Sequence, residues 1–68
     1  MNQESKSALL AEYYTRQELA EELGITQRSL ERWAWLRKGP AQTRIGQRVY
    51  YHRSAVEKWL SEQTEAAA

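Results

Sequence analysis

The 68-residue sequence contains no cysteine. This absence excludes disulfide cross-links, thiolate zinc sites and cysteine nucleophiles. A chain of this length forms one domain and buries only about 60% of the surface that it exposes when unfolded, so its core is small. Three Trp and four Tyr supply large side chains for that core. With 41% hydrophobic and 28% charged residues, the composition indicates a soluble, globular chain rather than a disordered one.

Long apolar runs and catalytic groupings are also missing. The longest apolar run, residues 8–11, is far shorter than a membrane span or the core of a secretory signal. The sequence therefore predicts no membrane association and, by default, a cytoplasmic location. No nucleophile with a base, paired-carboxylate site or phosphate-cradling loop is present, so we expect no enzyme, cofactor or small-molecule ligand. We expect the lone His52 to make a local hydrogen bond or to touch phosphate, not to bind a metal.

Positive charge is concentrated in the middle of the chain. Residues 24–53 carry seven Arg or Lys and one Glu, whereas residues 1–23 and residues 54–68 are each net acidic. The overall charge of +1 hides this division. A basic segment between acidic ends favours a surface that binds a polyanion. The alternative is a solvated surface with uneven charge.

Two capping patterns predict a pair of short helices. Residues 15–18 read Thr-Arg-Gln-Glu, a capping box that begins a helix at Thr15, and Gly24 suits the left-handed residue that ends it. Thr26 caps a second helix, which Lys-Gly-Pro at residues 38–40 stops. Leu30 and Trp33 are expected to face inward, and residue 35 or 36 to extend that stripe. Two helices joined by a glycine turn form a helix-turn-helix unit; the alternative is an ordinary helical hairpin.

Residues 42–51 predict a β-hairpin around Gly46. Side-chain parity favours a three-residue loop over residues 46–48, because this loop places Ile45 opposite Val49 on one apolar face. Arg44 and Tyr50 would then point outward. A two-residue loop would instead place Ile45 opposite an arginine.

A third helix is predicted to begin at Ser54. Residues 54–57 form a second capping box, and Val56, Trp59 and Leu60 follow at the spacing of a narrow buried stripe. These elements predict a mainly α fold with three helices and a two-stranded β-hairpin. We expect residues 1–12 to form a flexible arm with a helical turn at 8–11, residues 13–62 to form the folded domain and residues 63–68 to form a disordered tail.

The second helix carries side chains that suit DNA bases. The major groove of B-form DNA admits one α-helix, whose first turn usually meets the base edges. Arg bonds guanine, Gln bonds adenine and Ser suits either. We predict base contacts from four residues: Gln27, Arg28, Ser29 and Arg32. The alternative for the two arginines is solvent exposure, although an anionic partner would relieve their mutual repulsion. Glu31 is expected to face water or orient an arginine rather than to read a cytosine.

The hairpin and its neighbours offer contacts to phosphates, which position a protein without reading sequence. We predict such contacts from six residues: Arg16, Thr26, Arg44, Gln47, Arg48 and Arg53. The alternative is an edge hairpin whose charges protect it from aggregation. Trp33 and Trp59 are expected in the core. Trp35 either covers the loop at residues 39–40 or forms an exposed anchor for another protomer.

Several segments resemble one family. Tyr-Thr-Arg-Gln-Glu-Leu-Ala-Glu-Glu-Leu-Gly-Ile-Thr at residues 14–26 resembles the opening of excisionase-like, MerR-superfamily winged-helix domains, and Ser-Leu-Glu-Arg-Trp at residues 29–33 resembles their recognition helix. Residues 38–40, 44–51 and 54–60 complete the pattern in the same order. The resemblance covers about residues 13–61. One departure is Trp-Leu-Arg at residues 35–37, a stretch that is usually more polar and often has a glycine near Arg37, which puts the local turn geometry in question.

The resemblance implies a winged helix-turn-helix that binds double-stranded DNA. Many such proteins are phage or mobile-element recombination directionality factors, which bind and bend attachment-site DNA and steer an integrase toward excision. It also implies cooperative self-association on tandem sites. A small transcription regulator of the same fold is the alternative within DNA binding, and a protein-interaction module is the alternative from another class.

Overall fold

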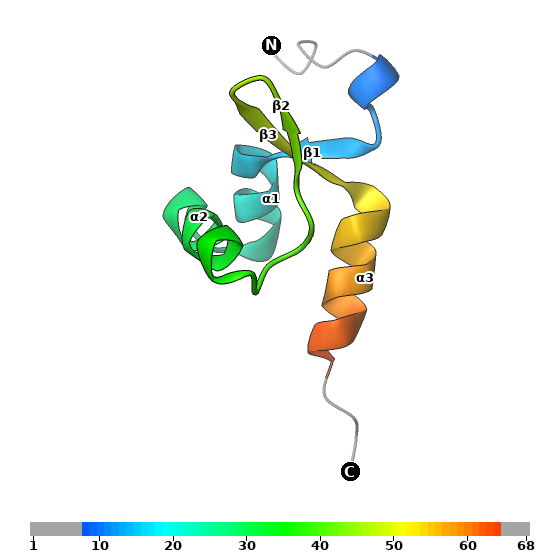
Figure 1. Ribbon diagram of the computed structural model, residues 1–68. Coiled ribbons are helices and arrows are strands. Elements are labelled where there is room, and N and C mark those ends of the chain that lie inside the picture. The colour runs from blue at the N-terminus through cyan, green and yellow to red at the C-terminus, as the bar shows by residue number, and fades with distance from the viewer. Residues whose placement is uncertain (1–7, 65–68) are drawn as a thin grey trace.

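The computed structural model describes residues 8–64, which form three α-helices and a small sheet (Figure 1). The elements in chain order are a 3₁₀ turn η2 (Ala8–Leu10), β1 (Tyr13–Thr15), α1 (Arg16–Leu23), α2 (Gln27–Leu36), β2 (Thr43–Ile45), β3 (Arg48–His52) and α3 (Arg53–Gln63). This is the mainly α, winged helix-turn-helix architecture that the sequence predicts. The predicted N-terminal arm and C-terminal tail lie largely outside the described residues, although the turn at residues 8–11 is present.

The first helix forms where its capping box predicts. The amide of Glu18 donates to the Thr15 hydroxyl at 3.0 Å, and the Thr15 amide donates to the Glu18 carboxylate at 2.9 Å. Gly24 ends the helix in the left-handed conformation at φ 71°. Its amide donates to the carbonyl of Glu21, and the Ile25 amide donates to that of Ala20. These two bonds make a complete Schellman motif, which turns the chain into the second helix.

The second helix ends earlier than the sequence indicates. The helix stops at Leu36 because Arg37 adopts the left-handed conformation at φ 58°, and Gly39 and Pro40 lie beyond its end. The amides of Arg37 and Lys38 close a Schellman motif of the same kind as at Gly24. The arginine thus occupies a conformation that glycine usually fills.

A third strand, β1, was not predicted. It is only three residues long and runs directly into the capped helix, so it leaves little pattern in the sequence. It pairs antiparallel with β3, with Tyr14 opposite Tyr51, and the sheet order is β1-β3-β2. The strand therefore anchors the start of α1 to the centre of the sheet.

The hairpin of β2 and β3, called the wing below, has a different register from the one predicted. Ile45 lies opposite Arg48 and Arg44 opposite Val49, so the turn contains two residues rather than three. Gly46 has φ 62°, whereas Gln47 has no positive φ, which matches a type II′ turn with glycine first. The prediction assumed that Ile45 and Val49 would lie opposite each other on a buried apolar face. That assumption was wrong, because the distal wing has no core beneath it and Ile45 is left 48% exposed.

The third helix has its cap two residues earlier than predicted. His52 is the N-cap, and the amide of Ser54 donates to its Nδ1 at 3.1 Å. The predicted capping box at Ser54 is therefore wrong, because this residue already lies inside the helix. The hydrogen bond confirms the local role expected for His52.

The core lies where α1, α2 and α3 meet the sheet. Its buried members are Leu19, Ala20, Leu30, Tyr51 and Val56. Tyr50, predicted to point outward, is instead buried against Tyr13, and Leu60, predicted to be buried, is 44% exposed because α3 extends beyond the sheet (Figure 1). Within residues 8–64, every helix is too short and too polar to cross a membrane.

Candidate nucleic-acid interface

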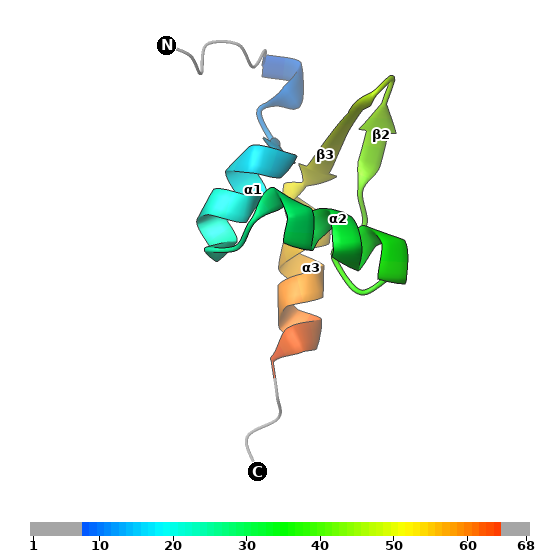
Figure 2. The same cartoon turned by 90° about the vertical axis from the view of Figure 1, so that its left-hand side faces the viewer.

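The exposed face of α2 combines two basic side chains with one amide, one acidic and one aromatic side chain. Its members are Gln27, Arg28, Glu31, Arg32 and Trp35, all of them exposed. At 3.6 residues per turn they span an arc of about 140°. The opposite face contains buried Leu30 and half-buried Trp33, so packing against α1 and the sheet fixes which side of α2 faces solvent. In Figure 2 this helix crosses the front of the molecule, and the wing rises above its C-terminal end.

The N-terminus of α2 is closed by its own cap. The Ser29 amide donates to the Thr26 hydroxyl at 3.1 Å, and that hydroxyl lies 3.1 Å from the Ser29 hydroxyl, to which it donates. Ser29 is half-buried. Of the four predicted base-reading residues, Ser29 is therefore the one whose side chain is hydrogen-bonded within residues 8–64.

Two of the predicted phosphate contacts meet α2 at a shallow hollow. The hollow is lined by Thr15, Arg16, Gln17, Gln27, Arg48, Val49 and Tyr50. Arg48 reaches it from the part of β3 that precedes the residues paired with β1. Arg16 reaches it from the first turn of α1. A second hollow, farther along α2, is lined by Arg28, Glu31, Arg32 and Trp35, and the Arg16–Glu31 ion pair connects the two linings. The structure thus brings Arg16, Arg28, Arg32 and Arg48 into two adjoining hollows.

An ion pair connects the two helices within this region. Arg16 Nη1 lies 3.3 Å from the Glu31 carboxylate, and the two side chains are 25% and 57% exposed. The Nε of Arg16 is buried and has no hydrogen-bond acceptor within residues 8–64. Glu31 therefore orients an arginine, which is one of the two roles expected from the sequence. That arginine belongs to α1.

The wing turns its two arginines to opposite faces. In an antiparallel pair, directly opposite residues lie on the same face of the sheet, and consecutive residues of one strand lie on alternating faces. Arg44 is opposite Val49 and therefore lies on the face of Val49 and Tyr51, which is the face toward the core. Arg48 lies on the other face with Tyr50. Both arginines and Gln47 are exposed.

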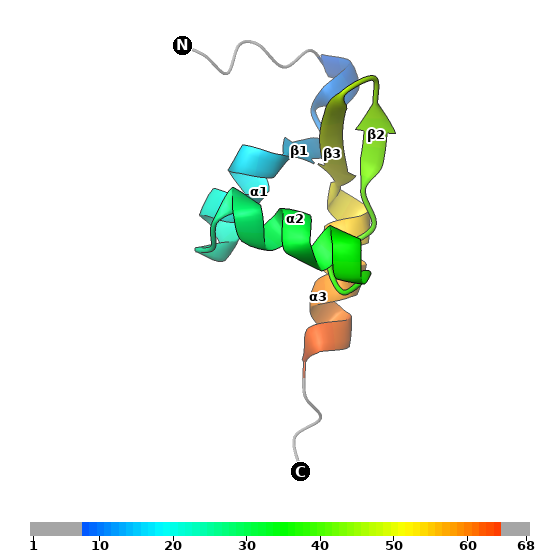
Figure 3. The ribbon, with the colours of Figure 1, turned by 60° about the vertical axis from the view of Figure 1, so that its left-hand side comes forward.

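Arg53 lies apart from the other predicted contacts. It begins α3, at the end of β3 opposite the wing turn (Figure 3). Its guanidinium lies 3.5 Å from Glu12 and 3.6 Å from Glu57. Since two carboxylates already neutralise it, Arg53 is the least suited of the predicted set to meet a phosphate.

Trp35 lies on the exposed face of α2 and does not cover the loop at residues 39–40. That loop is packed by Trp33 and Trp59, whose ring centroids are 5.6 Å apart, and Trp59 Nε1 donates to the Lys38 carbonyl at 2.8 Å. Trp35 is left 84% exposed beside the arginines. The sequence analysis did not place Trp35 beside the predicted base-reading arginines. The signal was present, because Trp35 follows Glu31 by four residues and Arg32 by three, which is the spacing of one helix face.

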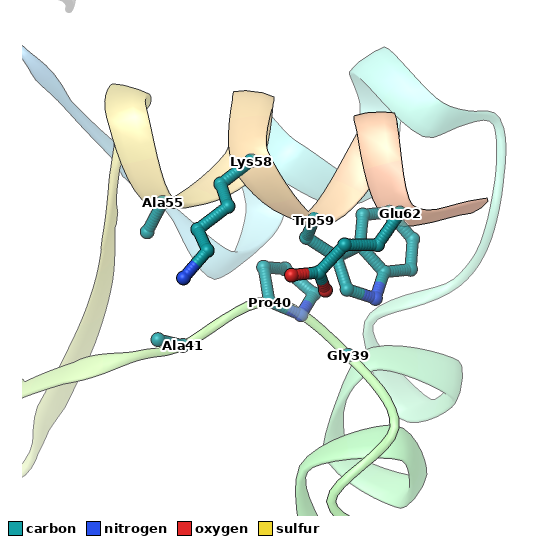
Figure 4. A pocket seen from close by; sticks show the side chains of 7 residues that line it. All are labelled: Gly39, Pro40, Ala41, Ala55, Lys58, Trp59 and Glu62. Carbon is teal, nitrogen blue, oxygen red and sulfur yellow. The ribbon is translucent and has the colours of Figure 1, made fainter. Parts of the chain in front are cut away.

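A separate hollow lies between the loop and α3. Figure 4 shows Pro40 facing Trp59 and Ala41 below Ala55 and the end of Lys58, with Lys58 and Glu62 extending from α3 toward the loop. This hollow has one lysine and one glutamate, whereas the other two hollows each contain two arginines. Residues 8–64 contain no cluster of three His, Asp or Glu side chains placed to hold a metal ion.

Comparison with known families agrees with this geometry. A family described as the helix-turn-helix domain matches residues 13–64, which span β1, both helices of the pair, the wing and α3. No curated protein matches the chain. Because the match includes nearly the whole folded region, the chain belongs to the helix-turn-helix domain family and is a DNA-binding domain of that kind.

Proposed function

We propose that the protein binds double-stranded DNA in a sequence-specific manner with α2 in the major groove. The observation that carries this proposal is the set of four arginines at the exposed face of α2: Arg28 and Arg32 from α2 itself, and Arg16 and Arg48 in the hollow between α1, the wing and the start of α2. Arg28 and Arg32 have no ion-pair partner among residues 8–64, and their like charges lie one turn apart. A DNA duplex supplies guanine acceptors and phosphates to both, which relieves their repulsion.

The contacts divide into two classes. Gln27, Arg28 and Arg32 read base edges, because they lie on the exposed face of a helix that the groove admits. Arg16, Arg48 and neighbouring polar groups of the wing and the cap hold the phosphate backbone, which fixes the register of the helix on the duplex. Those neighbouring groups are Arg44 and Gln47 of the wing and Thr26 of the cap, whose hydroxyl would have to leave the Ser29 hydroxyl in order to donate to a phosphate.

At the biological level, we propose that the protein is an excisionase, or recombination directionality factor, acting in the cytoplasm. It binds tandem sites in attachment DNA cooperatively, bends that DNA and directs an integrase toward excision. The resemblance of residues 14–26 and 29–33 to excisionase-like domains supports this role. A domain with one short recognition helix reads few base pairs, so cooperative occupancy of neighbouring sites raises its specificity.

The first experiment measures duplex binding as a function of salt by fluorescence anisotropy. Contacts with about four to six phosphates predict a log–log slope of about −4 to −5. A protein-interaction module would show no such duplex affinity. A flat salt dependence on every duplex would therefore end the proposal.

Two variants separate base reading from backbone contact. Arg28→Ala is expected to weaken the best site by about 1–3 kcal/mol and to relax its sequence preference. Arg48→Ala is expected to weaken all duplexes and to reduce the magnitude of the salt slope by about 1. Arg53→Ala is the matched control, because its guanidinium is already paired with two carboxylates. Equal losses from the first two variants on every sequence would refute the division.

The excision role is tested separately from DNA binding. Purified protein, the candidate integrase and attachment-site DNA are combined, and excision is measured beside DNA bending and footprinting. We expect excision to require the protein, DNA bending, and cooperative occupancy of adjacent sites. Tight promoter binding without bending or any effect on recombination would instead favour a transcription regulator.

A further inference from the structure

Trp35 is exposed in a way that the fold itself does not require. The side chain is 84% exposed on α2, beside Arg28 and Arg32, and it lines a hollow with them. Trp carries a large apolar surface, and its burial in another environment is strongly favourable. A partner that covers this face would gain that burial.

The interior offers no place for this side chain. Trp33, two residues earlier, packs against the core and against Trp59, and Gly39 fits so closely that a Cβ there would lie 3.2 Å from the Trp33 Cβ. The loop beyond α2 is therefore already filled. Trp35 consequently has no intramolecular role in packing the described part of the chain.

The charges beside Trp35 indicate the chemistry of the partner. An apolar protein surface placed over Trp35 would have to desolvate two arginines that lack ion-pair partners within residues 8–64, and unpaired buried charges are costly. The major groove presents both kinds of group together: guanine acceptors and nearby phosphates for arginine, and the apolar C5-methyl of thymine. Acceptors for arginine and an apolar methyl group in one surface thus favour DNA over an apolar protein surface as the partner.

We propose that Trp35 is a specificity-determining residue that contacts the C5-methyl group of a thymine in the major groove. The inference rests on the proposed placement of α2 in that groove. Trp35 lies eight residues after Gln27, a separation of about 12 Å along the helix axis. It therefore reads a base pair other than the one beneath Gln27 and extends the recognition surface to the C-terminal turn of α2.

The test uses a high-affinity duplex obtained by in vitro selection with the full chain. Each thymine of that site is replaced in turn by deoxyuridine, which removes only the C5-methyl group. Removal of one methyl that is buried on binding should weaken the wild-type protein about fourfold at one position. Trp35→Ala should weaken binding to the unmodified site about tenfold or more and should be insensitive to deoxyuridine at that same position.

Matched variants control for folding and for general loss of apolar surface. Leu9→Ala removes an apolar side chain that is 85% exposed in η2, away from α2. It should leave unchanged both the DNA affinity and the uracil profile, which is the loss of affinity at each thymine replaced by deoxyuridine. Trp35→Phe, which keeps an aromatic ring, should retain part of the uracil sensitivity. Circular dichroism should show all three variants folded, because each altered side chain is almost fully exposed.

The outcomes separate this inference from the proposed function. If Trp35→Ala impairs only cooperative binding to tandem sites and the uracil profile stays as in the wild type, Trp35 contacts a protein and the inference is overturned. The same holds if no thymine is sensitive to uracil, or if the selected site has no thymine. If the wild-type chain selects no duplex at all, the proposed function itself fails.

Discussion

The two caps that end α1 and α2 give a direct test of how backbone strain limits the stability of this domain. Gly24 has φ 71° and ψ 30°, and Arg37 has φ 58° and ψ 41°. Both close the same Schellman motif, so one backbone geometry is occupied by glycine in one case and by arginine in the other. We predict that Arg37→Gly stabilises the protein.

The magnitude follows from two opposing effects. A residue with a Cβ loses about 1–2 kcal/mol in the left-handed conformation, and glycine avoids this loss. Glycine also gains conformational freedom in the unfolded chain, which offsets about 0.5–1 kcal/mol. The arginine side chain is exposed and has no ion pair within residues 8–64, so its removal costs little. The net expectation for Arg37→Gly is a stabilisation of about 0.5–1 kcal/mol.

Urea and thermal unfolding measure this difference. For a domain of this size, about 0.5–1 kcal/mol corresponds to a rise in Tm of about 2–8 °C. Arg37→Ala is the control for the side chain and should lie close to the wild type, because alanine keeps the strained Cβ.

Gly24→Ala is the reciprocal variant. A Cβ at Gly24 meets nothing within 4 Å, so the expected destabilisation of about 1 kcal/mol comes from backbone conformation alone. If Arg37→Gly were neutral or destabilising while Gly24→Ala lost stability as expected, the reasoning from φ would be refuted, and the arginine side chain would have to contribute to the fold.

Three further outcomes are expected. His52→Ala should destabilise the protein by about 1 kcal/mol through loss of the α3 cap, whereas His52→Asn should retain most of the wild-type stability. Equal unfolding midpoints for the two variants would show that His52 does not stabilise α3 as its N-cap. Gly39→Ala should destabilise the protein by about 1–2 kcal/mol in urea unfolding, because the added Cβ would crowd Trp33, which packs against Trp59. An unchanged unfolding midpoint would show that the loop moves to accommodate the Cβ. Glu31→Gln should remove a carboxylate that competes for Arg16 and so strengthen the Arg16 phosphate contact, which raises duplex affinity at low salt with little change in stability. An unchanged affinity would argue against a phosphate contact from Arg16.

Features that depend on neighbours in the sequence were predictable. The Thr15 box, the Thr26 cap and the Gly24 turn each involve hydrogen bonds between residues no more than five apart, and all three appear as the pattern predicts. The exposed face of α2 follows in the same way from helical periodicity. The concentration of positive charge in residues 24–53 likewise predicted a basic surface, and Arg28 and Arg32 lie on the exposed face of α2.

Features that depend on distant parts of the chain were not predictable. The strand β1 exists because β3 lies beside it, and the register of the wing reflects a type II′ turn whose distal part has no core beneath it. Arg16 pairs with Glu31 across fifteen residues, and Arg53 pairs with Glu12 across forty-one. No local pattern encodes such partners, because they meet only after the helices have packed.

The sequence by itself determined the helix-turn-helix, its caps and the basic character of its second helix, because these arise from interactions within a few residues along the chain. Only the tertiary structure decided which arginines share a surface. It joined Arg16 and Arg48 to α2, turned Arg44 to the other face of the wing, neutralised Arg53, and left Trp35 exposed because Trp33 and Trp59 fill the adjoining loop. The physical reason is that long-range packing and strand register set side-chain directions.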